Sequence, residues 1–518
     1  MGVSILVDGT DAAYIPVGHT DYFHDVPKNQ ILPKNLFEGV KVPIVFHNAK
    51  FDISVLEEYG CTIPVGLIHD TMIMAHYINE NHKNYSLDML AKRFDLSQKA
   101  TNVAKVMKQN WNNIPVVAMG HYAAQDVVST GQLYEFLLPA YQEYKDLWID
   151  YDRDFMLLLS RMEDRGIPLD SKMCSDLANQ TKLRMFEIEH ELGFDPSKPS
   201  QIRAKLFSEP PVGLGLKPLS FTPANHLPQV NTAFLERQAH PVCALLLEYS
   251  RLKKYLTSYF LPYQKLAGLA GRIHPSFRQH GTVTGRLSCA DPNLQQVPRD
   301  SIVKDVFMPE KGCHLVEIDY SNIEMRLAVV YSNQNELWEE FSTREGDVHG
   351  RVAKALGIDR YKAKVVNFLI IYGGGANALA YQLQISPKEA SVIIEGMKKA
   401  YPEIFITMKQ AENACYNSGG TVRLWSDRVR HFPYPSEYHK AFNSVVQGGA
   451  FEIVKRSMLL LDAAGFDIRN QVHDSVWLNV PDDKMDTIPQ AENLMEGWVK
   501  NTFGLPFFVE SKILRSNL

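Results

Sequence analysis

Two aspartates that end separate apolar runs constrain the fold of this chain more than any other feature. Asp319 follows the run Leu315–Ile318 and precedes a helical pattern, whereas Asp474 lies much later, between the β-branched runs of Gln471–Val480. Carboxylates at strand ends can together hold a pair of Mg²⁺ ions, and such a pair supports in-line displacement at phosphorus. We therefore expect a strand that ends at Asp319 to meet a hairpin whose tip presents Asp474.

These carboxylates also have ordinary structural explanations. Asp319 has the character of a turn residue, and Ser321–Glu324 has the form of a capping box, in which Glu324 would cap the next helix. Asp474 shares a period-two face with apolar residues such as Val472 and Val476. A carboxylate on that face is costly to bury unless a charge or metal compensates, or unless the chain turns there. Asp474 is therefore the residue that favours a functional site.

A helix expected from Asp359 to Tyr372 has cations early and aromatic rings late on one face. Asp359 is a suitable N-cap, and the triplet Gly373–Gly375 can end the helix because glycine adopts left-handed φ. The face itself has a four-residue spacing and consists of Arg360, Lys364, Phe368 and Tyr372. Cations attract phosphates and a base can stack on a ring, so the face suits a nucleoside triphosphate. An amphipathic helix with snorkelling basic residues would show the same pattern.

Composition narrows the class of protein. A chain of 518 residues that is 45% hydrophobic and 22% charged is expected to form several domains with substantial cores. The net charge is −5, so a nucleic-acid surface must be a local cluster, such as 251–254, 351–364 or 423–430. Six scattered cysteines argue against zinc and disulfides. Since there is no targeting segment or membrane-length apolar run, we expect a cytoplasmic protein without a membrane partner.

Turn signals divide the chain. Residues 1 to about 148 mix short strands at 2–7, 13–17 and 43–46 with amphipathic helices, which indicates an α/β domain. The next helix should stop at Gly166, which places a domain boundary near residue 150. Residues 208–230 are expected to be a loop inside a mostly helical region, and the C-terminal segment alternates strands and helices.

Three groups of residues resemble motifs A, B and C of the family A DNA polymerases, the bacterial DNA polymerase I type. They are Val316–Arg326, the helix face Arg360 to Tyr372, and Val472–Asp474, with Thr284–Gln295 and Phe442–Gly448 as further signatures. The resemblance covers nearly the whole chain. It implies a DNA-directed DNA polymerase that adds deoxynucleotides to a primer 3′-hydroxyl, with a role in phage genome replication.

The resemblance also implies a multidomain α/β and α+β architecture. Residues 1–148 would be an RNase H-like 3′→5′ exonuclease domain that lacks its first strand. Residues 149–518 would be a right-hand polymerase domain, with the thumb at about 175–270, the fingers at about 335–430 and the palm in the remainder. We expect a monomer bound to primer-template DNA and deoxynucleoside triphosphates, and a processivity factor is left open.

Roles carry over residue by residue from this resemblance. Asp319 and Asp474 would be catalytic and, with the Tyr320 carbonyl, would hold two Mg²⁺ ions, for which Mn²⁺ could substitute. Nucleotide binding would involve His349, Arg360 and Lys364 at the triphosphate, Phe368 and Tyr372 at the sugar and base, Glu324 as the ribose gate, and Asn322. DNA binding would involve Arg286, Asn443, Gln447 and His473, together with the thumb residues Lys253 and Lys254.

Two positions depart from the family pattern. Motif C usually ends His-Asp-Glu, whereas residue 475 is serine here, so a carboxylate near the metals is missing and metal affinity or rate is expected to be lower. Asn322 stands where the family commonly has glutamine.

The N-terminal region departs further. Residues that resemble the later exonuclease motifs are Asn48, Asp52, Asp70, Tyr122 and Asp126. The Asp-x-Glu pair that this activity needs has no counterpart, because Asp8 and Asp11 have the wrong spacing. We therefore expect the exonuclease to be absent or impaired, unless an upstream start or another polypeptide supplies that segment. A nuclease with a vestigial C-terminal region and a non-catalytic DNA-binding scaffold remain the alternatives.

Overall fold

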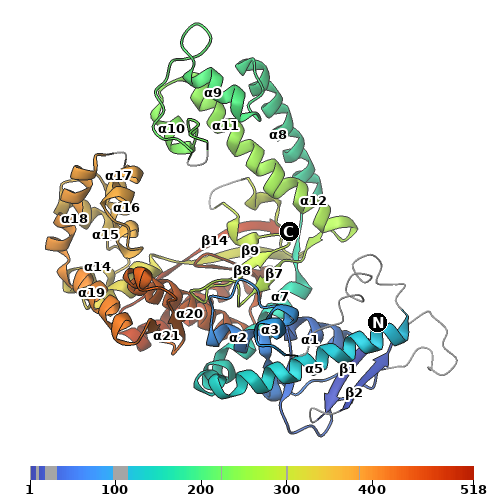
Figure 1. Ribbon diagram of the computed structural model, residues 1–518. Coiled ribbons are helices and arrows are strands. Elements are labelled where there is room, and N and C mark those ends of the chain that lie inside the picture. The colour runs from blue at the N-terminus through green and yellow to red at the C-terminus, as the bar shows by residue number, and fades with distance from the viewer. Residues whose placement is uncertain are drawn as a thin grey trace. The chain divides into compact units, whose positions relative to one another are not determined.

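The chain folds into two compact units. The computed structural model describes residues 2–7, 11–17, 32–96, 115–222, 225–298, 302–383 and 385–517. Unit 1 comprises Met1–Arg165, Phe277–Cys289 and Val316–Lys512, and unit 2 comprises Gly166–Ser276, Ala290–Leu315 and Ile513–Leu518. Many of the elements of both units are labelled in Figure 1.

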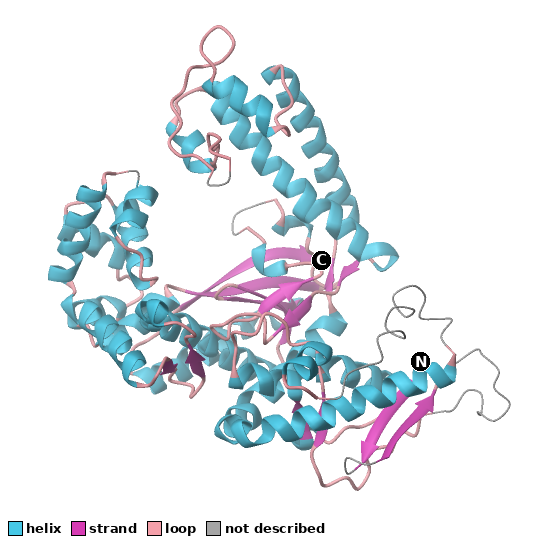
Figure 2. Ribbon diagram, in the orientation of Figure 1, coloured by secondary structure: helices cyan, strands magenta, loops and turns pink. Residues whose placement is uncertain are grey.

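The N-terminal part of unit 1 contains two short sheets. Strand β1 (Gly2–Val7) pairs antiparallel with β2 (Asp11–Pro16), and β3 (Ile44–Phe46) pairs parallel with β4 (Ile68–Asp70). Among the residues described, these pairs are separate two-stranded sheets, and the long helix α5 (Val116–Tyr141) contacts both (Figure 2). The strands expected near 2–7, 13–17 and 43–46 are thereby confirmed. The other helices are α1 (Ala49–Glu58), α2 (Thr71–Ile78), α3 (Leu87–Arg93) and α6 (Lys145–Leu147).

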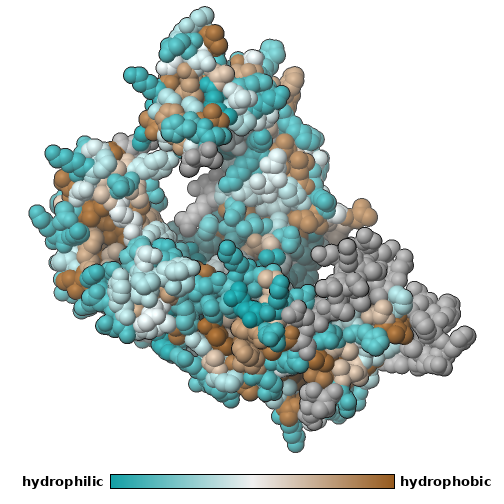
Figure 3. Space-filling view, in the orientation of Figure 1, coloured by the Kyte–Doolittle hydropathy of each residue, from teal (hydrophilic) through white to brown (hydrophobic). Residues whose placement is uncertain are grey.

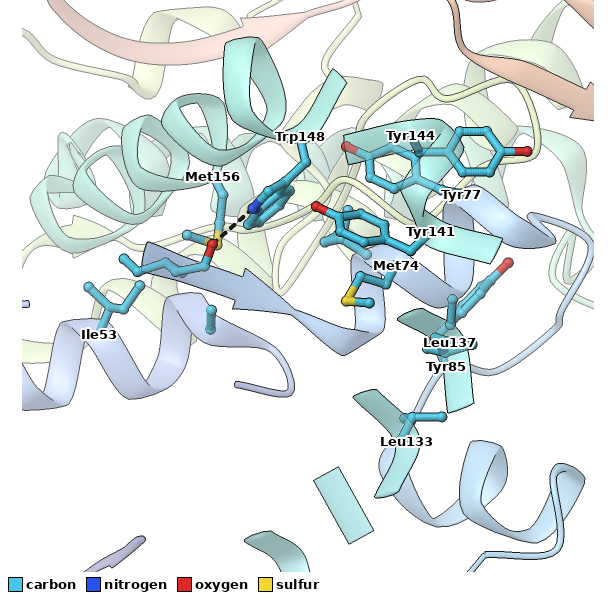
Figure 4. Close-up of a cluster of buried hydrophobic side chains, with 14 of the residues drawn as sticks. Ile53, Met74, Tyr77, Tyr85, Leu133, Leu137, Tyr141, Tyr144, Trp148 and Met156 are labelled. Carbon is cyan, nitrogen blue, oxygen red and sulfur yellow. Dashed lines mark hydrogen bonds between the residues drawn. The ribbon is translucent and has the colours of Figure 1, made fainter. Parts of the chain in front are cut away.

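An apolar core rich in aromatic side chains stabilises this part. Leu133, Leu137 and Tyr141 recur every four residues on α5 and are buried, so one face of the helix lies in the core. The indole of Trp148 donates a hydrogen bond to the Ile68 carbonyl at 2.9 Å, drawn as a dashed line in Figure 4. Because a buried indole N–H without a partner would be costly, this bond fixes the Trp148 ring beside β4.

A buried ion cluster joins the N-terminal part of unit 1 to its C-terminal part. Asp152 accepts hydrogen bonds of 2.5 Å from Lys455, Arg428 and the Tyr77 hydroxyl. Glu452 accepts at 2.8 Å from both cations, so two carboxylates balance two positive charges. Burial opposes ionisation of Asp152, but the charges of Lys455 and Arg428 outweigh it and hold its pKa below the usual value.

A four-stranded sheet forms the centre of the C-terminal part. Its strand order is β12 (Asp467–Val472), β13 (Ser475–Pro481), β9 (Cys313–Tyr320) and β14 (Val509–Asn517). Val472 pairs with Ser475, so β12 and β13 are joined by a two-residue turn, His473-Asp474. His473 has φ 54°, the left-handed conformation that such a hairpin turn requires. The hairpin expected from the sequence is therefore confirmed.

The helices of this part of unit 1 alternate along the sequence with the strands of the sheet. They are α7 (Arg153–Arg165), α13 (Ile323–Ser332), α14 (Asn335–Phe341), α15 (Val348–Leu356), α16 (Arg360–Ile371), α17 (Ala376–Leu383), α18 (Pro387–Ala400), α19 (Pro402–Asn417), α20 (Ala441–Ala463) and α21 (Ile488–Phe503), with a small hairpin of β10 (Thr421–Arg423) and β11 (Val429–His431). Helix α20 contacts α13, α19, α21 and β12, and most of its residues are buried. The predicted stop after α7 is confirmed, because Gly166 has φ 56°.

Unit 2 is mainly helical. It contains α8 (Ser171–Leu192), α9 (Pro199–Phe207), α10 (Thr232–Arg237), α11 (Pro241–Tyr255) and α12 (Leu261–Ala267), with β5 (Ile167–Pro168) pairing antiparallel with β6 (Arg272–Ile273). Asp170 and Asn231 cap α8 and α10, each accepting a backbone N–H at 2.8 Å. Strands β7 (Ser276–Arg278) and β8 (Ser288–Ala290), most of whose residues belong to unit 1, form one further pair.

The remaining sequence expectations concern thiols and membranes. All six cysteines are buried thiols. No helix in the described part of the chain is both long and apolar enough to cross a membrane. Hydrophilic and hydrophobic side chains are intermixed over the face seen in Figure 3.

Candidate active site

The structure brings Asp319 and Asp474 together at one end of the central sheet. Asp319 is the penultimate residue of β9, and the backbone N–H of Tyr320 donates to the Asp474 carbonyl at 3.3 Å. Both aspartates are partly exposed, with 23% of the Asp474 side chain accessible. Adjacent strands β9 and β13 therefore bring two aspartates from distant parts of the chain to neighbouring backbone positions.

Tyr320 anchors this junction from the opposite side. Its hydroxyl is buried and makes hydrogen bonds of 2.7 Å with the Ser457 hydroxyl and the Met495 carbonyl. The side chain is thus held by α20 and α21. Its backbone carbonyl, which the resemblance implicates in metal binding, belongs to the same short stretch as Asp319.

Glu324 does not cap its helix, so the expected capping box is wrong. The N-cap of α13 is Asn322, with φ 55° and no side-chain capping bond. Glu324 is only 5% exposed and forms an ion pair with Arg286, while the Tyr372 hydroxyl donates to its other oxygen. The Glu324 carboxylate turns away from the helix end because two stronger partners lie on the other side.

Arg286 links Glu324 to Asp474. Its guanidinium pairs with Glu324 and lies 3.9 Å from the Asp474 carboxylate. Burial raises the pKa of Glu324, an effect that Arg286 and Tyr372 oppose and that the charge of Asp474 reinforces. Tyr372, at the end of α16, thereby reaches the same centre as the two sheet carboxylates.

The loop that presents Arg286 lies against a glycine of α20. A Cβ at Gly448 would approach the Thr284 carbonyl oxygen to 2.5 Å, closer than real Cβ contacts allow. Gly448 is therefore required for the close packing of this loop on the helix. On α20, Asn443 and Gln447 lie one turn apart and are half-buried, five and one residues before that contact.

Helix α16 has the termini that the sequence predicts. Asp359 accepts the backbone N–H of Lys362 at 2.8 Å, and Gly373, with φ 70°, follows the last turn. The buried face includes Val366 and Leu369, while the Arg360–Tyr372 face is exposed or half-buried. The predicted two-sided helix is confirmed.

The cations of that face have different partners. Arg360 is 64% exposed and donates to Asp347 at 3.0 Å, whereas Lys364 pairs with no carboxylate among the described residues. His349 is buried beside α16 and its Nδ1 lies 2.9 Å from the Asn367 side-chain nitrogen. Burial, and then the charges of Arg360 and Lys364, lower the pKa of His349. The ring is therefore neutral near pH 7.

Arg326 is an anchor to which sequence reasoning assigned no role. Its buried guanidinium donates to the carbonyls of Ser321 at 2.9 Å and of Phe341 and Pro506 at 2.7 Å. These bonds fix the turn that follows Asp319. Glu317, which contacts β13, was also missed, and its two-residue spacing from Asp319 was the available signal.

Lys253 and Lys254 belong to unit 2. Both are exposed on the last turn of α11, as expected for basic residues that meet solvent or a charged partner.

The N-terminal residues that resemble exonuclease motifs also cluster. Asp70 caps α2 and accepts backbone N–H groups from Asn48 at 3.2 Å, Ala49 at 2.8 Å and Met72 at 2.8 Å. The pKa of Asp52 is raised to about 7, mainly by burial, next by the charge of Asp70 and to a smaller extent by that of Asp126. Asp52 on α1 and Asp126 on α5 are thus electrostatic neighbours.

The other residues of that region have distinct positions. Tyr122 is half-buried one turn before Asp126 on α5, and Asp11 is exposed at the start of β2. Asp8 lies outside the described residues.

The residues at the Asp319–Asp474 junction fit a divalent cation whose remaining coordination positions are filled by substrate. No group of three or more His, Cys, Asp or Glu is arranged to hold a metal within the described ranges. Mg²⁺ commonly takes only one or two carboxylates and fills its remaining positions with water and substrate phosphates. Two adjacent, partly exposed aspartates match that requirement.

Comparison with known proteins assigns both regions. Residues 170–516 match the family described as DNA polymerase family A, and residues 4–142 match the family described as 3′-5′ exonuclease. The chain is 28% identical to DNA polymerase I of Pseudomonas aeruginosa, over 99% of this chain and 61% of that protein. It is 27% identical to DNA polymerase I of Synechocystis, over 96% of this chain and 56% of that protein. The chain therefore spans about three fifths of the length of these relatives.

A solved structure shares the fold. The POL domain of Pol1 from M. smegmatis, in complex with DNA primer-template and dNTP, matches with a TM-score of 0.77 and 24% identity. The match covers 90% of this chain and 85% of that one. The architecture of an exonuclease-like domain followed by a polymerase domain is therefore that of the family.

Proposed function

Because the chain belongs to DNA polymerase family A, we propose that it is a DNA-directed DNA polymerase that adds deoxynucleotides to a primer 3′-hydroxyl in template order. The observation that carries the proposal is the junction of Asp319 with Asp474, joined through Arg286 to Glu324 and Tyr372. Two carboxylates, a cation and the aromatic end of α16 thus converge on one end of the sheet.

Asp319, Asp474 and the Tyr320 carbonyl would hold two Mg²⁺ ions, with Mn²⁺ as a substitute. When bound, the ions supply activation of the primer hydroxyl and charge neutralisation for the leaving pyrophosphate. The protein's own contribution is to hold the two carboxylates at fixed positions, through the β9–β13 pairing and the Tyr320 and Arg326 anchors.

The incoming nucleotide would lie along the exposed face of α16. Lys364 is available to a phosphate at once, whereas Arg360 must exchange its pair with Asp347 for the triphosphate. His349 would donate a hydrogen bond to the triphosphate as a neutral ring, and Phe368 would pack on the sugar and base. Glu324 would exclude a 2′-hydroxyl, with Asn322 at the start of the same helix. Tyr372 would occupy the position of the templating base until the helix closes.

Primer-template DNA would contact a second group of residues. Arg286 and His473 flank the aspartates, and Asn443 and Gln447 present amides from α20. Lys253 and Lys254 would bind duplex phosphates in a manner that depends on salt and not on sequence. The corresponding subdomains would be a thumb at about 175–270, fingers at about 335–430 and a palm in the remainder of 149–518.

We further propose that the region 1–148 has little or no 3′→5′ exonuclease activity. Asp70 is engaged by three backbone N–H groups, which leaves Asp52 and Asp126 as the other described carboxylates among the residues that resemble exonuclease motifs. Two carboxylates without a further acidic pair offer a poor clamp for two metals. A terminally labelled single strand incubated with the protein and Mg²⁺ tests this, and rapid removal of nucleotides would refute it.

The cellular setting completes the proposal. The protein would act as a monomer in the cytoplasm, in phage genome replication, with or without a processivity factor. Elution of the purified protein at twice its mass of 58.8 kDa would contradict the monomer.

Primer extension tests the central activity against the alternatives. With a primed template, four deoxynucleotides and Mg²⁺, the protein should lengthen the primer in template order. Asp474→Ala should abolish extension but retain DNA binding in a mobility-shift assay. A nuclease would shorten the primer, and a scaffold would bind DNA without changing its length.

A further inference from the structure

Glu317 places a third carboxylate at the end of the sheet that bears Asp319 and Asp474. It lies two residues before Asp319 on β9, and side chains two apart on a strand point to the same face. Both residues are half-buried, whereas Ile318 between them is fully buried. Glu317 and Asp319 therefore share the more accessible side of β9.

The neighbouring strand holds the Glu317 carboxylate in place. The Trp477 indole N–H donates to a Glu317 oxygen at 3.1 Å. The Ser475 hydroxyl lies 3.1 Å from the same oxygen and 2.9 Å from the Val472 carbonyl, so its proton is shared between these two acceptors. Ser475 directly follows Asp474, and Trp477 lies two residues further along β13. Glu317 therefore belongs to β9, the strand that carries Asp319 near its end. Its carboxylate contacts β13, the strand that directly follows Asp474.

A purely structural acceptor would not need a charge at this position. A neutral amide oxygen can accept the same two hydrogen bonds, and an ionised carboxylate is costly to keep half-buried near two further aspartates. A divalent cation beside Asp319 and Asp474 would offset that cost, since a negative charge roughly 7 Å along the strand attracts it. Glu317 is not grouped with those aspartates as a direct metal site among the described residues, so its effect acts at this longer range.

We propose that Glu317 is a positioning residue of the polymerase centre, which raises the affinity of the Asp319–Asp474 pair for divalent cations and is held for that role by Ser475 and Trp477. The inference rests on the proposed function for the identity of the metal site. It also changes the expectation for Ser475, because the carboxylate absent at residue 475 is returned from the adjacent strand.

Substitutions separate charge from shape. Glu317→Gln keeps the size and the accepting oxygen but removes the charge, and it should weaken Mn²⁺ binding about fivefold. Adding Ser475→Glu to that variant returns a carboxylate across the strand pair and should recover most of the loss. Asp483→Asn is the matched control, since Asp483 is exposed beyond the far end of β13 and should leave Mn²⁺ binding unchanged.

The experiment is Mn²⁺ titration of the full chain bound to primer-template, followed by electron paramagnetic resonance, with thermal unfolding to confirm that each variant is folded. Wild-type affinity in Glu317→Gln, or no recovery in the double variant, would overturn the inference. If Glu317→Gln does not fold, Ser475→Glu in the wild-type chain should tighten Mn²⁺ binding, and unchanged affinity would overturn it.

Failure of the proposed function has a different signature. In that case the wild-type protein does not extend a primer, or Asp319→Asn leaves Mn²⁺ binding intact. The effect of Glu317 on Mn²⁺ affinity is measured without synthesis, so failure of the inference can be distinguished from failure of the proposed function.

Discussion

Replacing Asp152 by asparagine should lower the free energy of unfolding of unit 1 by about 3–5 kcal/mol, the usual cost of removing one partner from a buried ion pair. In the native cluster Asp152 and Glu452 balance Lys455 and Arg428, and all four side chains are less than one tenth exposed. Asparagine leaves both cations with Glu452 alone, so one buried positive charge lacks compensation.

Urea unfolding at pH 7, followed by circular dichroism, measures this loss. The matched control is Asp462→Asn, which breaks a 2.5 Å pair between Arg161 and the same helix α20 on the surface. Because exposed pairs contribute at most about 1 kcal/mol, the control should change little. The double variant Asp152→Asn/Lys455→Met leaves Glu452 with Arg428 and should recover about 1–3 kcal/mol.

The pH dependence provides an independent check. Folding lowers the pKa of Asp152. Its contribution to folding stability is therefore complete above its pKa in the unfolded chain, about 4, and is lost as the pH falls through its lower pKa in the folded protein. The difference between wild type and Asp152→Asn should therefore shrink below about pH 4. An Asp152→Asn variant no less stable than Asp462→Asn at pH 7 would refute the reasoning.

Three further predictions concern single side chains. The pKa of Asp52 is raised to about 7, so its contribution to stability is present at low pH and lost as the pH rises through that value. The N-terminal part of unit 1 should therefore melt at a lower temperature at pH 8 than at pH 5.5. Asp52→Asn should remove most of that difference in melting temperature. Lys364→Ala should raise KM for deoxynucleotides about tenfold, because Lys364 has no carboxylate partner in the described structure and is available to a phosphate. The control is Lys362→Ala, which should leave steady-state kinetics unchanged, because Lys362 is paired with Asp359 at 3.4 Å. Glu324→Ala should increase ribonucleotide incorporation about tenfold or more in primer extension, and unchanged sugar discrimination would contradict the role of that buried carboxylate.

Local signals in the sequence predicted individual elements well. Asp359 at the start of α16 and Gly373 after its end follow from capping chemistry, which involves only neighbouring residues. The hairpin that presents Asp474 follows from alternation interrupted by two turn residues. Such features depend on interactions within a few positions of the chain, so their energy is visible in the sequence.

Glu324 shows where local reasoning fails. A capping box was the cheapest local use for its carboxylate, but tertiary folding supplies Arg286 and Tyr372, from distant parts of the chain. Charge-assisted bonds in a buried site are stronger than a cap exposed to water, so they decide the conformation. Glu317 is a second case, because its partners Ser475 and Trp477 become neighbours only when β13 joins β9.

The amino-acid sequence alone determined which residues could act and in what order they occur: two strand-end aspartates, a helix with cations before aromatic rings, and motifs that resemble a family A polymerase. Only the tertiary structure decided which of them meet. Strand pairing placed Asp474 against Tyr320, and packing on Gly448 brought the Arg286 loop to the same place. The physical reason is that contacts between remote segments depend on the register and packing of whole elements, and no local pattern encodes that arrangement.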